Sequence, residues 1–145
     1  MTFIINECVG EFYIWLKLYM SYVNILRAGT DHTIWAKGVE FYRDELELMT
    51  KRLLEVSSKN TSVEANKGVE HFQNQFIIQQ KNLSDLKHQV NNYVKGLSND
   101  AKNHSGHVDA IFITQGDGLR QRYEHLEQIM NSLRHEFNDY LSKWM

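Results

Sequence analysis

Apolar residues recur along most of the chain at alternating spacings of three and four, the period that keeps one face of an α-helix turned toward a partner. The clearest stripe reads His32, Trp35, Val39, Tyr42, Leu46, Met49, Leu53 and Val56. A second stripe begins at Val69, with Gln79 as its one polar member, and a third begins at Leu119. A strand would alternate at every second residue, so the three stripes predict three helices.

The first segment of the chain is apolar on most of its surface. One stripe, which we take as the predicted interaction face, consists of Phe12, Trp15, Tyr19 and Tyr22. A neighbouring stripe includes Tyr13, Leu16 and Met20. A helix of this kind is buried in its own bundle, packs in an oligomer interface or lies on a membrane surface. The sequence leaves these alternatives open, although the polar positions lack the Lys and Arg residues that hold a helix on anionic lipid.

These patterns predict an all-α fold, a four-helix bundle with helices over about 3–27, 32–57, 62–95 and 117–144. Gly29, followed by Thr and Asp, predicts a break between the first two helices. The polar residues 57–61 predict a short turn between antiparallel helices, with Thr61 or Ser62 as the N-cap. Residues 96–116 hold several glycines and predict a connection, for which a plain loop and a short extra helix both remain open.

The composition agrees with one domain over residues 1–145, divided into an aromatic-rich first helix (1–28) and the remainder (30–145). The chain has 42% apolar and 23% charged residues and no proline, where average usage would give about seven. Because proline ends or kinks helices, its absence favours long helices. The formal charge of -2, with no run of basic residues, argues against a nucleic-acid partner.

Cys8 is the one cysteine of the sequence, which excludes a disulfide within the chain and favours a reducing, cytoplasmic location. The N-terminal segment carries Glu7 and Glu11 where a secretory signal would carry Lys or Arg. The apolar stretch over 12–26 is short for a bilayer and is interrupted by Lys17. We therefore expect no secretory signal and no transmembrane segment.

Seven histidines suggest a metal centre, since helical bundles build such sites from His and carboxylates on facing helices. If the chain reverses direction near residue 60 and again after residue 96, several of these residues lie at a similar height along the bundle axis. The candidate ligands for Fe or Zn are His32, Glu45, His71, His88 and His125. The competing interpretation is structural, because His88 lies opposite its apolar stripe, where it would meet solvent. His104 and His107 form a separate HxxH candidate.

Signals for catalysis are weak. Cys8 lies on an apolar stripe with no basic neighbour in the sequence, which is typical of an inert thiol. The patterns GxSxG, HExxH, GxGxxG and the P-loop do not occur. We expect a non-enzymatic protein with no cofactor, apart from the metal alternative.

Several short motifs follow one another along the chain: His32-x2-Trp35, FYRDEL (41–46), EVSSKNT (55–61), EHFQNQF (70–76), LKH (86–88), GLR (118–120) and LRHEFNDYLSKWM (133–145). Together they resemble an uncharacterised family of bacterial helical-bundle proteins, over about residues 30–145. This resemblance implies an α-helical bundle and no particular reaction. The architecture is also similar to hemerythrin-like bundles, but here His71-x3-Gln75 and His135-x3-Asp139 stand where a di-iron centre needs HxxxE, HxxxH and HxxxxD.

The expected function is protein–protein interaction or a structural role, in a homo-oligomer or with another protein, through the aromatic first helix. The alternative is a metal-binding, degenerate hemerythrin-like bundle that uses inward histidines and carboxylates.

Overall fold

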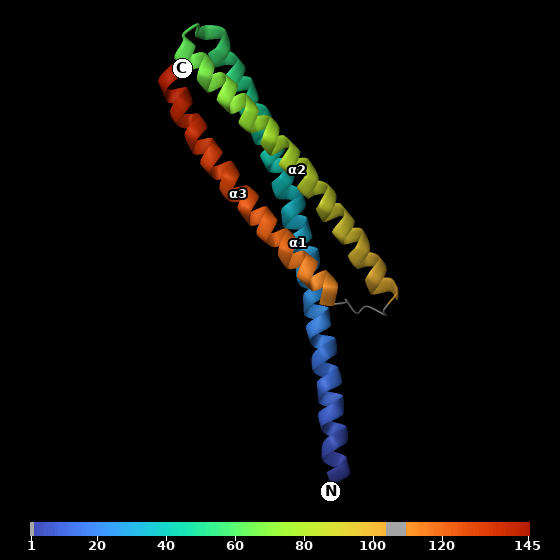
Figure 1. Cartoon of the computed structure of the whole chain (residues 1–145). Helices are drawn as coiled ribbons and strands as arrows, with labels where there is room; N and C mark the ends of the chain where they lie inside the picture. Colours follow the sequence, from blue (N-terminus) through green and yellow to red (C-terminus); the bar gives the residue numbers. More distant parts are fainter. Residues whose placement is uncertain (1, 104–109) are drawn as a thin grey trace.

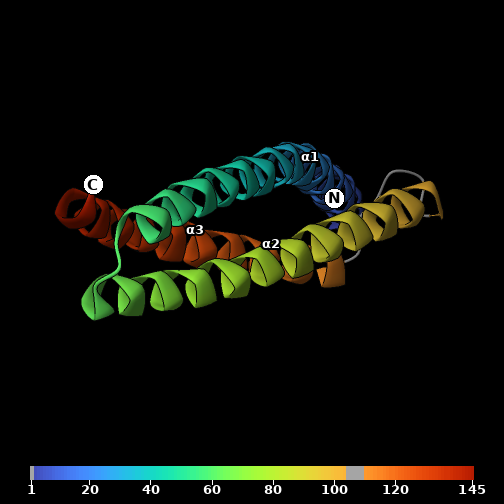
Figure 2. The same cartoon turned by 90° about the horizontal axis from the view of Figure 1, so that it is seen from above.

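The computed structural model describes residues 2–103 and 110–145, and the side chains of these residues except those of 2–9, 21–25 and 110. The chain forms α1 (Thr2–Lys59), α2 (Val63–Asn103) and α3 (Ala110–Trp144), and the described residues contain no strand. Helix α2 runs antiparallel to α1, and α3 returns beside both (Figures 1 and 2). The predicted all-α bundle is confirmed.

All four predicted helical segments are helical, but the first two are joined in one continuous helix. The predicted break at Gly29 is therefore wrong. The hydroxyls of Thr30 and Thr33 donate to the carbonyls of Leu26 and Gly29, one turn earlier in the same helix. These residues thus bond within the helix instead of capping a new one, and Asp31 is paired with a residue of α3.

The core lies between the bundle half of α1, which we define as residues 28–59, and the two other helices. It contains most residues of the stripes that the sequence predicts, although some of them, such as His32, Val69 and Tyr123, are only partly buried. The buried members of the core are Trp35, Val39, Tyr42, Leu46, Met49, Leu53, Phe72, Phe76, Leu83, Leu86, Val90, Tyr93, Leu119, Leu126, Met130, Leu133 and Phe137. Near one end, Phe137 packs edge-on against Phe72 and Phe76. Burial of such rings dominates the stabilisation of a small bundle.

The turn between α1 and α2 is shorter than predicted, since α1 ends at Lys59 and α2 begins at Val63. The backbone N–H of Ala65 donates to the Ser62 hydroxyl at 3.1 Å, which confirms Ser62 as an N-cap. The Asn60 side chain donates to the Trp144 carbonyl at 3.2 Å. This contact ties the last turn of α3 to the connection between the first two helices.

The region 96–116 is mostly helical, because α2 continues to Asn103 and α3 already begins at Ala110. Packing explains Gly96 and Gly116, the two glycines of this region that the structure describes. A Cβ atom at Gly96 would lie 2.9 Å from the Phe112 ring, and one at Gly116 would lie 2.6 Å from the Tyr93 hydroxyl. These glycines let neighbouring helices approach each other, and they do not mark a loop.

The other half of α1, residues 2–27, extends beyond the bundle, where no other helix of the described residues lies beside it, and we call it the projecting half (Figure 1). In the described residues, the first buried side chain of the core is that of Trp35. The fold therefore consists of a three-helix bundle and a single helix that continues out of it.

Candidate functional site

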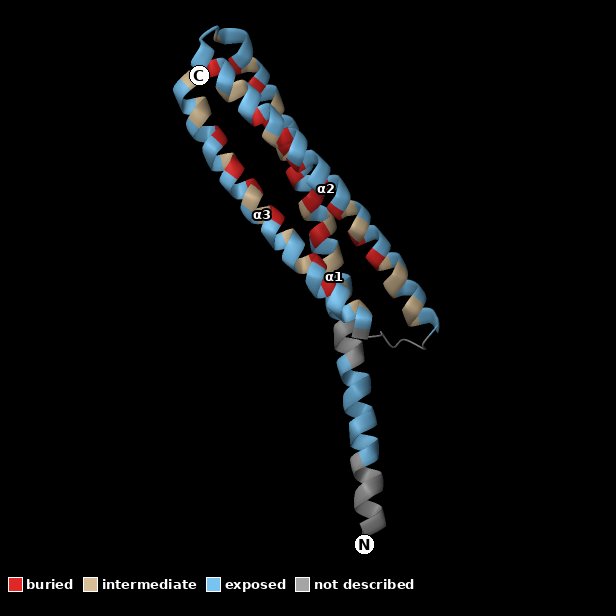
Figure 3. Cartoon of the chain, in the orientation of Figure 1, coloured by how far each residue is buried: buried red, intermediate tan, exposed pale blue. Residues whose placement is uncertain are grey.

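The projecting half of α1 exposes large apolar side chains over nearly three turns (Figure 3). They are between 40% and 70% exposed and comprise Phe12, Tyr13, Ile14, Trp15, Leu16, Leu18, Tyr19 and Met20. The rings of Trp15 and Tyr19 stack on each other at 5.6 Å between centroids. The interpretation that this segment is buried in its own bundle is therefore wrong, and the described part of the predicted interaction face is open.

Apolar residues surround this segment on almost every side. Ile14 and Leu18 lie on the side of α1 that continues the core stripe. Trp15 and Tyr19 lie about 100° from them round the helix axis, and Leu16 lies on the side opposite the core stripe. Between residues 10 and 20 the charged residues are Glu11 and Lys17. A surface of this kind and size normally marks an interaction site. Tyr22, the fourth member of the predicted face, lies outside the residues whose side chains are described.

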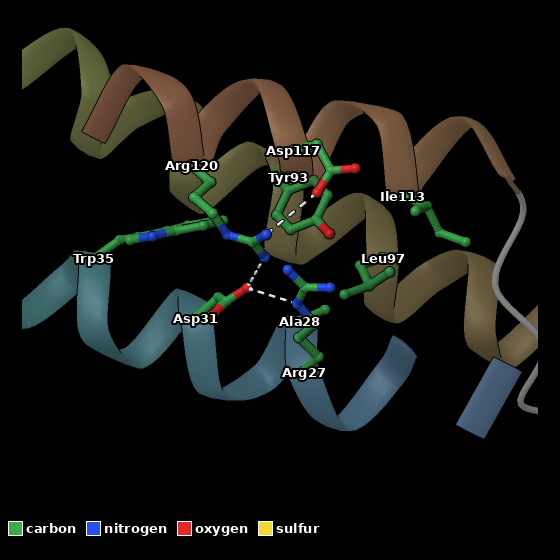
Figure 4. A pocket seen from close by; sticks show the side chains of 10 residues that line it. Arg27, Ala28, Asp31, Trp35, Tyr93, Leu97, Ile113, Asp117 and Arg120 are labelled. Carbon is green, nitrogen blue, oxygen red and sulfur yellow. Dashed lines mark hydrogen bonds and ion pairs between the residues drawn. The ribbon is translucent and has the colours of Figure 1, made fainter. Parts of the chain in front are cut away.

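A charged cluster lies where the projecting half leaves the bundle (Figure 4). Arg120 on α3 pairs with Asp31 on α1 and with Asp117 at 3.5 Å, and Arg27 lies 3.9 Å from the Asp31 carboxylate. The small cavity around them, of about 60 Å³, also touches Tyr93. Burial raises the pKa of the Tyr93 hydroxyl, and the charges of Asp31 and Asp117 raise it further.

This cluster is suited to holding helices together. Each carboxylate in it already has a guanidinium partner, and a cavity of this size holds about two water molecules, so it offers little room for a substrate. The Asp31–Arg120 pair fixes α1 against α3 at the base of the projecting half. We assign it a positioning role.

The five candidate metal ligands do not come together. His32 is half-buried on α1, His71 packs edge-on against Phe72, and both His88 and His125 are exposed. Glu45 is occupied, because Arg134 on α3 binds its carboxylate through two nitrogens. Among the residues that the structure describes, no three His, Cys, Asp or Glu side chains are grouped closely enough to hold a metal ion. The sequence predicted which residues lie at a similar height along the bundle axis. It did not predict whether their side chains share one face.

Two further candidates cannot be placed. His104 and His107, the HxxH pair, lie outside the described residues, as does the side chain of Cys8.

Sequence reasoning missed exposed apolar residues on the bundle half of α1. Ile34, Phe41 and Leu48 are each more than half exposed although their helix neighbours Trp35, Tyr42 and Met49 are buried. The signal was present in the sequence as a spacing of seven residues, outside the core stripe.

Comparisons with known proteins add no relative. No family model matches the chain, and the comparisons with curated proteins and with solved structures find no significant match. Within the described residues, no helix is both long and apolar enough to cross a lipid bilayer. Function must therefore be inferred from the chain's own residues.

Proposed function

We propose that this protein is a helical interaction module that self-associates through the projecting half of α1. The observation that carries the proposal is the run of exposed aromatic and aliphatic side chains between Phe12 and Met20, which only Lys17 interrupts. Soluble monomers rarely expose contiguous apolar patches of more than a few hundred Å². Burial of such a surface contributes about 25 cal/mol per Å², so water favours any partner that covers it.

A second copy of the chain is the occupant that we propose. A helix bound in the plane of a membrane needs a broad polar face with several Lys or Arg residues, whereas this segment offers Lys17 alone between residues 10 and 20. Trp and Tyr are also the side chains that protein interfaces favour. The rings of Trp15 and Tyr19, which stack on each other, are both more than half exposed.

The test is multi-angle light scattering of the full chain over a range of concentrations. We expect an oligomer for the wild type and a monomer for the variant Tyr13→Glu/Met20→Glu, whose two positions are 70% and 58% exposed on the projecting half. The control Leu54→Glu/Ile77→Glu changes residues that are 64% and 58% exposed on the bundle, and it should remain an oligomer. A wild-type protein that is monomeric, and that instead sediments with anionic vesicles, contradicts the proposal and favours a membrane surface.

A further inference from the structure

One exposed apolar stripe continues along α1 from the projecting half onto the bundle half. Ile34, Phe41 and Leu48 are 53%, 58% and 58% exposed, and the same seven-residue spacing leads back to Met20 and Tyr13. Seven residues return a supercoiled helix to the same side. We call these five residues, with Arg27 at the sixth place, the outer stripe. These exposed residues form one line along the helix, because they recur at a constant seven-residue spacing over about 52 Å.

The outer stripe is separate from the core face. Each of its members on the bundle half immediately precedes a core residue, so it lies about 100° round the helix. Helix α3 contacts α1 at Gly38, under Tyr123, and at Glu45, which binds Arg134. These contacts lie four residues after Ile34 and Phe41, along one edge of the outer stripe. The six residues of the stripe are nevertheless each more than half exposed in the single chain.

We infer that two copies of the chain pair antiparallel along this stripe, so that the projecting half of each copy lies on the bundle half of the other. This inference rests on the proposed function and specifies its partner surface. It explains why the bundle half carries apolar residues on its solvent side. It also extends the contact well beyond the projecting half, toward the roughly 800 Å² per partner that a stable interface buries.

Charge determines the direction of the pair. Lys37 and Asp44 lie three residues after Ile34 and Phe41, at the second set of contact positions of a heptad seam. In a parallel pair in register, each would meet its own copy, as would Arg27, and like charges in contact are unfavourable. An antiparallel pair avoids this repulsion.

The antiparallel register follows from the apolar positions. When Leu16 of one copy lies level with Phe41 of the other, Tyr13 comes level with Asp44 and Met20 with Lys37. The tyrosine hydroxyl is then a donor for a carboxylate, and the methionine covers the alkyl stem of a lysine. In this register Leu16 of the projecting half packs on Phe41 of the bundle half, whereas Tyr13 and Met20 contact charged side chains.

Cross-linking with a short bis-maleimide tests this register, in a Cys8→Ser background so that no native thiol reacts. Chains carrying Leu16→Cys, mixed with chains carrying Phe41→Cys, should give a covalent dimer that contains one of each. Each variant alone should give at least tenfold less product. Strong cross-linking of the Phe41→Cys variant with itself would overturn the antiparallel arrangement.

A second measurement separates this inference from the proposed function. Ile34→Glu/Leu48→Glu should weaken dimerisation at least tenfold, whereas Leu54→Glu/Ile77→Glu, off the stripe, should leave the dimer constant within twofold. Circular dichroism verifies that each variant is folded. A wild-type dimer that tolerates Ile34→Glu/Leu48→Glu overturns the outer stripe alone, and a wild-type monomer overturns the proposed function as well.

Discussion

Gly38 of α1 lies directly against the ring of Tyr123 of α3, and a Cβ atom at Gly38 would overlap the tyrosine hydroxyl. The same arrangement recurs at Gly68, which receives the Tyr140 ring. The Tyr140 hydroxyl reaches past its glycine to donate to the Ala65 carbonyl at 2.7 Å. Glycine normally weakens a helix interior, so these residues are present because they admit an aromatic ring from the next helix.

Gly38→Ala should therefore destabilise the bundle. Alanine gains up to about 1 kcal/mol of helix propensity over glycine, but overpacking costs about 1–3 kcal/mol, because the new Cβ atom would overlap the hydroxyl and the ring of Tyr123, which must then shift. We expect a net loss of about 1–2 kcal/mol in the free energy of unfolding, measured by urea denaturation.

Gly118→Ala is the matched control, because a Cβ atom there would meet nothing within 4 Å. This variant should be neutral or more stable by up to about 1 kcal/mol. In a Tyr123→Ala background, Gly38→Ala should become neutral or stabilising, since the ring is absent. If Gly38→Ala stabilises the wild-type chain as Gly118→Ala does, the close contact between Gly38 of α1 and the Tyr123 ring of α3 is contradicted.

The glycine positions show what the sequence could and could not reveal. Periodicity predicts the core, because residues such as Leu46, Leu83 and Met130 owe their burial to a local three-four pattern. The function of Gly96 and Gly116 depends on rings that reach them from other helices, Phe112 on α3 and Tyr93 on α2. No local pattern contains that information, so these glycines suggested a connection.

The candidate functional site could likewise be predicted from the sequence only in part. The aromatic run around Trp15 is visible in the sequence as an excess of apolar positions, and the structure shows that it is exposed. The histidines were grouped by their level along the bundle, but a ligand set also requires one common face. Glu45 illustrates the difficulty, since its partner Arg134 lies 89 residues later in the chain.

The Glu45–Arg134 pair should stabilise the packing of α1 against α3. Arg134 donates through two nitrogens, one of them at 2.8 Å, and this bonding raises the pKa of its guanidinium. Because both side chains are partly exposed, we expect Glu45→Gln to cost about 1 kcal/mol of unfolding free energy, and less at high salt. Glu47→Gln removes a fully exposed pair with Lys51 and should change little. Equal effects of the two variants would argue against a specific role for Glu45.

Tyr42 should make stability depend on pH in the alkaline range. Burial raises the pKa of its hydroxyl above the ordinary value of 10.0, and the charge of Glu127, to which it donates at 3.2 Å, raises it further. The folded chain therefore holds this proton more tightly than the unfolded chain. The contribution is complete below about pH 10 and is lost as pH rises through the folded pKa.

Urea denaturation of the wild type and of Tyr42→Phe at pH 8 and pH 11 measures this effect. At pH 8 the variant should be less stable by about 1 kcal/mol, through the lost hydrogen bond. The difference between the two proteins should shrink or reverse at pH 11. A difference that is constant from pH 8 to pH 11 contradicts the raised pKa.

Metal analysis decides the alternative function. Because the described residues bring no three suitable ligands together, we expect Fe and Zn far below one equivalent per chain in protein purified without a histidine tag. Adding either metal should not change the midpoint of thermal unfolding. One equivalent of bound metal that raises this midpoint, and that His32→Ala abolishes, would restore the metal-binding hypothesis.

Deleting residues 1–27 should separate association from folding. The described core begins at Trp35, so the shortened chain should keep a cooperative unfolding transition by circular dichroism. It should also be monomeric, because the exposed aromatic run is gone. A shortened chain that associates as strongly as the full chain would move the interface to the bundle.

The mass of the full-length chain in solution tests the central claim most directly. Light scattering should give at least twice the 17.1 kDa of one chain at micromolar concentration, falling toward one chain on dilution. A mass of 17.1 kDa at every concentration, for a folded protein that stays in solution, would contradict self-association through α1.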